Sequence, residues 1–367
     1  MSLISPSLQA RYASLLDQAT AVIHRHQPLS VKDELSVLAD TVRDDDRRDT
    51  YGRGGMLEAF EAELCTLLSK PDCLFLPTGT LAQCVAVKCA SLRTGRQGVA
   101  LHPTSHLLLH EHMAVEHLWG LKSVETGKPE QVLKARDLDA LDPASLCALI
   151  VETPMREIGG AMPSWDDLLA IRQWCDTHGV HLHLDGARLW QTARGYERTL
   201  AQIAGVFDSI YISFYKDLGG IFGAALLADK ALIDEARVWA RRAGGNPITQ
   251  YAEVLAARRG LAHYLPMMPE FVHYTRVLCD AIRPLPLTLI PEQPEAAMFH
   301  VRLPMDANRL VTRLNDYAQQ TGVMVLPLPR SGSDTHCVCE VSVGDNAVRH
   351  APDFWAKHLH ACLHQSL

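Results

Sequence analysis

Residues 180–188 read Val-His-Leu-His-Leu-Asp-Gly-Ala-Arg, an alternating apolar run that ends on a carboxylate. A run of this kind followed by a glycine is typical of a buried strand that ends in a turn. Asp185 stands at the end of the run, where an unpaired carboxylate is costly to bury unless a cation or several hydrogen-bond donors meet it. The stretch therefore predicts a strand-end Asp that either caps a following helix or belongs to a binding site.

Short apolar runs and amphipathic stretches alternate on both sides of this strand. The other apolar runs are residues 73–77, 98–102, 145–153, 209–215 and 223–228. Helical patterns lie between them, among others at 164–178 and 230–243. This alternation predicts an α/β fold with a mainly parallel sheet flanked by helices. Ligands of such sheets bind beyond the carboxyl ends of the strands, so the polar residues that follow the apolar runs are candidates for a binding site.

The pattern changes toward both ends of the chain. Residues 1–45 show a helical spacing of apolar residues, and we expect an N-terminal helical segment there. Residues 46–250 hold the strand–helix alternation and are expected to form one large α/β domain. Residues 251–367, where prolines separate short strand and helix patterns, are expected to form a small C-terminal α+β domain.

The composition argues against several classes of protein. The 367 residues carry a formal net charge of -7 and are 47% hydrophobic, which disfavours disorder and a nucleic-acid partner. No apolar run approaches the roughly 20 residues of a membrane span, and the N-terminal stretch lacks the pattern of a signal peptide. Ten cysteines occur without framework spacing. We therefore expect reduced thiols in a cytoplasmic protein that has no membrane partner.

Two further apolar runs are followed by residues that carry chemistry. Thr78, Gly79 and Thr80 come at a helix start, where backbone N–H groups and hydroxyls suit a phosphate, although a Thr there is also a common N-cap. Lys216 directly follows the run 209–215. A desolvated Lys loses its charge and becomes a nucleophile toward carbonyl compounds, whereas a Lys whose head reaches water does not.

A phosphate-binding helix start, a strand-end carboxylate and a strand-end Lys are together what pyridoxal 5′-phosphate (PLP) needs. The helix start anchors the phosphate, Asp185 keeps the pyridine nitrogen protonated, and Lys216 forms the Schiff base. The face of the ring also needs a cover, for which the His-rich stretch 102–112 offers candidates.

The same histidines permit a different interpretation. His106 and His110 are four residues apart, and with Glu111 or His112 they could bind a metal ion. Clustered histidines in a loop are more often surface or hydrogen-bonded residues, so we expect no metal.

The sequence resembles the threonine aldolase and β-eliminating lyase family, which consists of PLP-dependent enzymes of fold type I. The resemblance is clear over residues 49–245. The motifs that carry it are Asp49-Thr50-Tyr51-Gly52, Leu76 to Gln83 (LPTGTLAQ), His106 with Glu111, His183 to Arg188 (HLDGAR) and Ser213 to Lys216 (SFYK).

The resemblance implies roles for individual residues. The implied cofactor-binding residues are Thr78, Gly79, Thr80, His106, Asp185, Arg188, Ser213 and Lys216. Catalytic roles fall to four of these: Lys216 as the Schiff-base residue, His106 stacked on the pyridine ring, Asp185 at the ring nitrogen and Arg188 beside the substrate carboxylate. Tyr51 would approach the active site from a dimer partner, so the resemblance implies a homodimer or a homotetramer.

The sequence departs from the family where the substrate would bind. Met155 stands where the family's threonine aldolases have a His that meets the substrate hydroxyl. The family's Arg after a double glycine and its Arg on a late strand are both absent. Arg156 and Arg330 are therefore the next candidates, after Arg188, for the substrate carboxylate. Tyr215 replaces a small Ser beside the Schiff-base Lys.

We predict a PLP-dependent lyase that acts on a small amino acid. The favoured reaction is retro-aldol cleavage of a β-hydroxy amino acid to glycine and an aldehyde. β-Elimination or racemisation of another amino acid is an alternative, since the choice depends on which bond to Cα is aligned with the ring. A non-enzymatic PLP-binding protein, which the missing arginines suggest, and a nucleotide- or metal-dependent lyase are alternatives of other classes.

Overall fold

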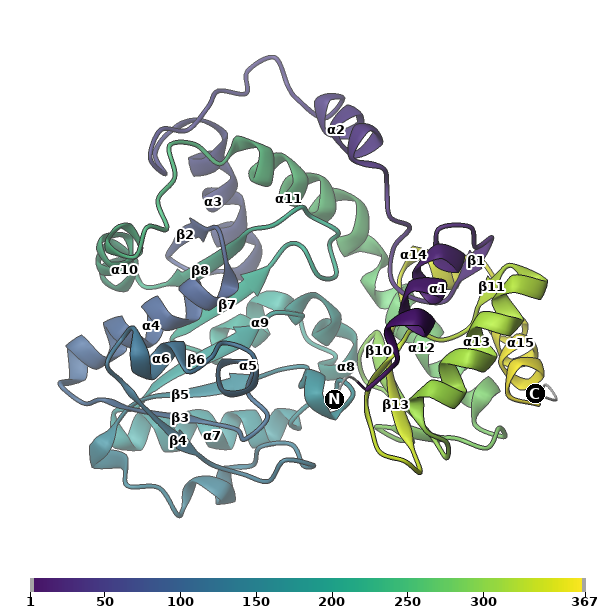
Figure 1. Ribbon diagram of the computed structural model, residues 1–367. Helices are drawn as coiled ribbons and strands as arrows, with labels where there is room; N and C mark the ends of the chain where they lie inside the picture. Colours follow the sequence, from purple (N-terminus) through teal and green to yellow (C-terminus); the bar gives the residue numbers. More distant parts are fainter. Residues whose placement is uncertain (1–2, 365–367) are drawn as a thin grey trace. The chain divides into compact units, whose positions relative to one another are not determined.

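The computed structural model describes residues 3–364, which form two compact units (Figure 1). The larger unit comprises Leu29–Glu157 and Met162–Pro266. The smaller unit comprises the N-terminal residues up to Pro28, Ile158–Ala161 and the residues from Met267 onward. No helix within residues 3–364 is long and apolar enough to cross a membrane.

The larger unit is built on a seven-stranded sheet with the order β2-β8-β7-β6-β5-β3-β4. Its strands are β2 (Asp72–Leu76), β3 (Gly98–Leu101), β4 (Lys122–Glu125), β5 (Leu146–Glu152), β6 (His181–Gly186), β7 (Ser209–Ser213) and β8 (Ala224–Ala228). β8 is antiparallel to β2 and β7, and all the other strands run in one direction. The predicted mainly parallel sheet is confirmed, and the carboxyl ends of all strands but β8 share one edge.

Helices connect and cover these strands. They are α2 (Val31–Ala39), α3 (Gly55–Leu68), α4 (Gly79–Thr94), α5 (His106–Leu109), α6 (Ala114–His117), α7 (Trp165–His178), α8 (Thr192–Tyr196), α9 (Leu200–Gly205), α10 (Lys230–Arg242) and α11 (Tyr251–Tyr264). Short 3₁₀ helices are η1 (Ala135–Leu138), η2 (Pro143–Ser145), η3 (Arg156–Ile158), η4 (Leu189–Gln191) and η5 (Leu265–Met267).

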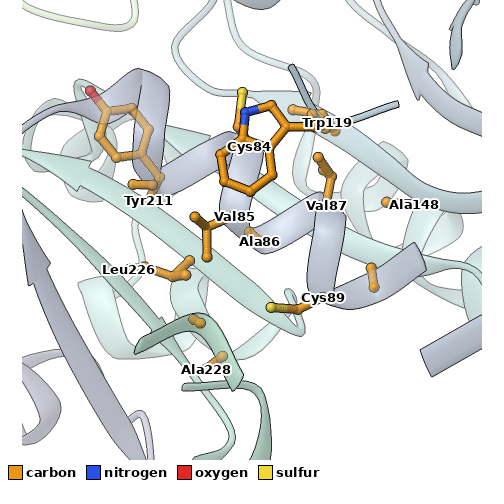
Figure 2. Close-up of a cluster of buried hydrophobic side chains, with 14 of the residues drawn as sticks. Cys84, Val85, Ala86, Val87, Cys89, Trp119, Ala148, Tyr211, Leu226 and Ala228 are labelled. Atoms are coloured by element: carbon orange, nitrogen blue, oxygen red, sulfur yellow. The ribbon is translucent and has the colours of Figure 1, made fainter. Parts of the chain in front are cut away.

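The core of the larger unit lies between α4 and the sheet (Figure 2). The buried side chains labelled there are Cys84, Val85, Ala86, Val87 and Cys89 of α4 with Trp119, Ala148, Tyr211, Leu226 and Ala228. Removing such apolar surface from water stabilises the fold by roughly 25 cal/mol per Å². The cysteines serve here as small apolar residues: all ten have free thiols, and all but Cys65 are buried.

The smaller unit contains an antiparallel four-stranded sheet with the order β12-β13-β10-β9. Its strands are β9 (Thr288–Ile290), β10 (Met298–Leu303), β12 (Pro329–Gly332) and β13 (Cys337–Ser342), and β1 (Ala21–Val22) pairs separately with β11 (Val323–Met324). Its helices are α1 (Pro6–Leu16), α12 (Met268–Ile282), α13 (Ala307–Thr321), α14 (Asp345–Val348) and α15 (Pro352–His364). Tyr12 of α1 donates a hydrogen bond to the carbonyl of Leu326 (3.0 Å), so the start of the chain packs on residues near its end.

Candidate active site

The chemistry-bearing residues predicted at strand ends lie along one edge of the seven-stranded sheet. Asp185 is the second-last residue of β6, Lys216 follows β7, and Gly79 begins α4 shortly after β2. These strands run in one direction, so their carboxyl ends present the side chains at the same edge. The fold thus brings together three segments that are far apart in sequence.

Asp185 is 2% exposed and lies in register with Tyr211 of β7 and Glu152 of β5. Its Oδ1 accepts a hydrogen bond from the N–H of Ala187 (3.1 Å), so one carboxylate oxygen shapes the turn after β6. Gly186 lets the strands approach closely, because an added Cβ would come within 2.6 Å of the carbonyl oxygen of Tyr211. The turn therefore holds the carboxylate at the strand end in a fixed direction.

Lys216 is partly buried between two aromatic rings. Its Nζ lies 5.9 Å from the ring centre of Tyr211 and 5.7 Å from that of Tyr215. Burial lowers the pKa of Lys216, and the neighbouring Arg188 lowers it further, while Asp185 and other carboxylates oppose the shift. The side chain is thus a desolvated amine of the kind that attacks a carbonyl carbon.

Glu152 is a second carboxylate at this edge, at the end of β5 and in register with Asp185. Its Oε1 accepts a hydrogen bond from the N–H of Arg156 (2.9 Å). Burial and the adjacent Asp185 raise the pKa of Glu152. Glu152 was not among the residues predicted for the site, although it lies near the end of the apolar run 145–153 and so meets the same strand-end criterion.

The start of α4 offers backbone donors at the same edge. Thr78 is the N-cap, and its Oγ1 accepts a hydrogen bond from the N–H of Leu81 (3.2 Å). The N–H groups of Gly79 and Thr80 have no acceptor within the helix, and the helix dipole favours an anion there. Only a glycine fits at position 79, because an added Cβ would overlap the ring and hydroxyl of Tyr211.

Several buried polar atoms near these segments have no hydrogen-bond partner within residues 3–364. They include Oε1 of Gln83, one turn into α4 from Gly79, Oε2 of Glu111, on the loop that follows β3, and Oγ of Ser213 at the end of β7. Buried polar groups normally have a partner, so these atoms indicate that a polar group is to be accommodated. The N–H groups at the start of α4, the amine of Lys216 and the carboxylate of Asp185 together fit the phosphate, the aldehyde and the ring nitrogen of PLP.

His106 begins α5, on the connection that follows β3. Its Nδ1 lies 3.0 Å from Oε1 of Glu111, whose side chain is 2% exposed, so the two residues that match the family motif are in contact. His106 itself remains 36% exposed. A buried carboxylate thus fixes the orientation of an imidazole that faces solvent.

A second imidazole–carboxylate pair stands beside the first. Nε2 of His110 lies 3.0 Å from Oε1 of Glu157, and the ring centres of His106 and His110 are 4.9 Å apart. Nη1 of Arg156 lies 3.6 Å from the same Glu157 oxygen. No group of three or more metal-ligating side chains suited to a metal ion occurs within the described part of the chain.

The remaining predicted residues lie in different environments. Arg188 (4% exposed) follows Asp185 in the turn after β6, and Ser213 ends β7 and is fully buried. Tyr51 is 50% exposed and lines a cavity of about 690 Å³ with Arg241 and other residues of the larger unit. Arg330 belongs to the smaller unit, where its Nη1 lies 3.2 Å from Nε2 of His300 and 3.5 Å from Oε2 of Glu340.

The sheet topology, together with the likeness to solved structures, shows the fold of PLP-dependent enzymes of fold type I, as the sequence predicted. The chain belongs to the β-eliminating lyase family, whose model matches residues 37–359. A crystal structure of a protein assigned as an L-allo-threonine aldolase from Listeria monocytogenes EGD-E has 31% sequence identity and a TM-score of 0.91. That match covers 97% of this chain and 99% of the other.

Two curated relatives carry different names. Aldolase vrtJ of Penicillium aethiopicum is 33% identical over 232 residues, and alanine racemase TOXG of Cochliobolus carbonum is 29% identical over 206 residues. The matches cover 61% and 54% of this chain, and 58% and 52% of the two relatives. The chain therefore aligns with little more than half the length of these relatives.

Proposed function

We propose that this protein is a PLP-dependent lyase that cleaves the Cα–Cβ bond of a β-hydroxy amino acid to give glycine and an aldehyde. The observation that carries the proposal is the desolvated amine of Lys216 at the same sheet edge as the buried carboxylate of Asp185. The likeness to a protein assigned as an L-allo-threonine aldolase supports the choice of reaction.

The chain's own residues would hold the cofactor at three points. The N–H groups of Gly79 and Thr80 would bind the phosphate at the start of α4. Asp185 would keep a proton on the pyridine nitrogen, and the neutral amine of Lys216 would bond to the cofactor aldehyde. PLP supplies an electron-withdrawing ring that takes up the electron pair of the bond broken at Cα.

Substrate contacts follow from charge and position. Arg188 is the first candidate for the substrate carboxylate, because it is one of the charges that act on Lys216. A guanidinium matches a carboxylate with two parallel hydrogen bonds. Arg156, in the segment that follows β5, is the second candidate. The substrate contacts of Arg330 and Tyr51 stay predictions from the sequence.

Racemisation is a second candidate function, and two observations favour it. Met155, in place of the family's His, is 1% exposed and has no group that accepts a proton from a substrate hydroxyl. One curated relative is named an alanine racemase. In this case the bond broken would be Cα–H rather than Cα–Cβ.

The test is a panel of amino acids offered to the purified, PLP-loaded protein. We expect glycine and acetaldehyde from L-threonine or L-allo-threonine, and no product from the variant Lys216→Ala, which should also lose the absorption of covalently bound PLP. Lys230→Ala is a matched control, because the Lys230 side chain is 74% exposed and forms an ion pair with Asp234 of the same helix. Racemised alanine without aldehyde would favour the second candidate, and bound PLP without turnover of any amino acid would contradict both.

A further inference from the structure

We propose that His110 is the catalytic base that takes the proton from the substrate's β-hydroxyl, with Glu157 as its positioning residue. The inference rests on the proposed retro-aldol function and names the group that this reaction requires. Cleavage of Cα–Cβ turns the hydroxyl into an aldehyde, so a group near Cβ has to accept the hydroxyl proton.

The position at which the family's aldolases have a His cannot supply this group here. Met155 carries a thioether, which does not act as a proton acceptor at neutral pH, and its side chain is buried at 1% exposure. The neighbouring Thr153 is fully buried, and its Oγ1 lies 2.8 Å from the hydroxyl of Tyr196. The segment after β5 therefore contains carboxylates and the guanidinium of Arg156, but no imidazole that could accept the hydroxyl proton.

The imidazole comes instead from the connection that follows the neighbouring strand. β3 pairs in parallel with β5, so the segments after their carboxyl ends meet at the same edge. His110 is the C-cap residue of α5 in the segment after β3, and Glu157 lies in the segment after β5. Nε2 of His110 and Oε1 of Glu157 are 3.0 Å apart. The His110 side chain is 38% exposed, and that of Glu157 is 17% exposed, so the outer part of the imidazole is accessible to a ligand.

His110 lies next to His106, the residue that the resemblance places over the cofactor ring. The two ring centres are 4.9 Å apart with an interplanar angle of 48°. His106 is the predicted cover of the cofactor ring, and its Nδ1 is engaged by Glu111. The charged groups that face His110 are thus His106 from its own helix and Glu157, with Arg156 behind it, from the β5 segment.

The other histidines of this stretch lack these properties. Both ring nitrogens of His102 are engaged, by Thr104 (2.7 Å) and by the carbonyl of Lys128 (2.8 Å). Burial also lowers the pKa of His102. His112 is exposed and adopts a left-handed φ of 49°, and no ring contact or ion pair of the described chain involves it. His110 alone combines a carboxylate partner with contact to His106.

The proposed step balances in atoms and electrons. With Nε2–H donated to Glu157, Nδ1 of His110 is the proton acceptor. The substrate O–H bond breaks and its proton moves to Nδ1, while the O–H electron pair forms the C=O bond of the aldehyde. The Cα–Cβ bond breaks, and its electron pair stays with the Cα fragment, which takes up a proton and leaves as glycine. His110 then returns its proton to solvent, so no oxidant or reductant is needed.

The test compares a reaction that involves the hydroxyl with one that does not. In the PLP-loaded enzyme, His110→Asn should lower kcat for cleavage of L-allo-threonine by roughly 10²–10⁴-fold. Exchange of the Cα protons of glycine with D₂O, which involves no hydroxyl, should stay within about threefold, and the absorption of bound PLP should be unchanged. Added imidazole should restore part of the cleavage in His110→Ala.

Two further variants separate catalysis from structure. Glu157→Gln keeps a hydrogen-bond acceptor for His110 but removes the charge, and it should lower kcat less than His110→Asn does, with little change in KM. His112→Asn is the matched control and should behave like the wild type, since Asn tolerates its left-handed backbone.

The outcomes distinguish this inference from the proposed function. If the wild type releases no aldehyde from any β-hydroxy amino acid, the retro-aldol function and the role of His110 are both wrong. If the wild type cleaves and His110→Asn cleaves equally well, or loses cleavage and glycine exchange to the same extent, the role of His110 alone is refuted.

Discussion

Lys216 is surrounded by charges of both signs and by two tyrosine rings. Burial and Arg188 favour its neutral form, whereas Asp185, Glu152 and Asp217 favour the ammonium. The balance lowers its pKa, so the amine is available for reaction at a lower pH than that of an ordinary Lys.

Arg188, whose charge acts on the Lys216 amine, should therefore influence the pH at which Lys216 reacts with PLP. Arg188→Gln removes a positive neighbour, so the pKa of Lys216 should rise toward its ordinary value. The pH profile for covalent uptake of PLP by the apoprotein should shift to higher pH, measured by absorption. Arg194→Gln, an exposed Arg on α8, is the control that should leave the profile in place. A profile that is equal in both variants would remove Arg188 from the list of groups that act on Lys216.

At this scale the sequence predicts contacts within one motif better than contacts between motifs. The resemblance singled out His106 and Glu111 without predicting a contact, and their spacing along one short segment brings them together. Glu152, which neighbours Asp185, and the pair of His110 and Glu157 were missed. These contacts depend on which strands are neighbours, and the strand order cannot be read from local patterns.

The start of α4 is one of the tightly packed helix ends of the larger unit. Gly79 packs directly against the ring of Tyr211 on β7, which leaves no room for a side chain. The close packing brings the first N–H groups of the helix to the edge of the sheet where Lys216 lies.

Adding one carbon at this point should separate α4 from the sheet. Gly79→Ala should lower the free energy of unfolding by roughly 1–3 kcal/mol and weaken PLP binding by at least about tenfold, since overpacking displaces the helix start. Adding Tyr211→Ala should restore part of both, measured in a double-mutant cycle. Tyr211→Phe should restore neither, because the added Cβ would still overlap the ring carbon Cζ. Equal rescue by Phe and Ala would show that the hydroxyl, rather than the ring, sets the limit.

A buried ion pair joins three other elements of the larger unit. Glu61 of α3 is 6% exposed, and its Oε1 accepts a hydrogen bond from the N–H of Phe75 in β2 (2.7 Å). Its Oε2 lies 3.0 Å from Nη2 of Arg237 in α10. Burial raises the pKa of Glu61 from 4.5 to about 7, although Arg237 and the hydrogen bond from Phe75 oppose the shift.

This raised pKa should make stability depend on pH. The folded state holds the Glu61 proton more tightly than the unfolded state, so the stabilisation is complete below pH 4.5 and is lost as the pH rises through about 7. In the wild type, the free energy of unfolding measured with urea should fall between these two pH values. In Glu61→Gln this fall should be smaller by of order 3 kcal/mol. Glu58→Gln, exposed on the same helix, should keep the wild-type slope. An unchanged slope in Glu61→Gln would assign the pH dependence to other groups.

The strands that sequence predicts are those buried on both faces. The apolar runs 73–77, 98–102 and 209–215 correspond to β2, β3 and β7. β4 was missed, because Lys-Ser-Val-Glu at the edge of the sheet is largely exposed and lacks an apolar pattern. Edge strands of this kind are defined by their pairing with a neighbour rather than by their own side chains.

The larger unit exposes many large apolar side chains. They include Tyr51, Tyr215, Ile221, Phe222, Val238 and Ile248, whose exposed fractions lie between 37% and 57%. Exposed apolar groups in such number are typical of surfaces that meet another protein. We expect a homodimer or homotetramer in which Tyr51 reaches the active site of the neighbouring subunit.

Mixing of inactive subunits tests this arrangement. Lys216→Ala and Tyr51→Ala should each be nearly inactive alone. If Tyr51 acts on the partner's site, mixed dimers contain one intact site, and an equal mixture should recover about a quarter of the wild-type activity. Recovery of no activity, with mixed dimers present by mass spectrometry, would place Tyr51 in the site of its own chain. A monomer by light scattering that is fully active would contradict both arrangements.

The parallel pairing of β1 with β11 joins Ala21 to Val323, two residues that lie almost the whole chain apart. Because the ribosome makes the protein from its N-terminus, β1 cannot pair with β11 until most of the polypeptide has emerged. The larger unit can complete its sheet in the meantime, since β8 ends at Ala228. β1 is therefore placed only after the sheet of the larger unit is complete, and a nascent chain stalled before residue 323 should expose this segment to chaperones and proteases.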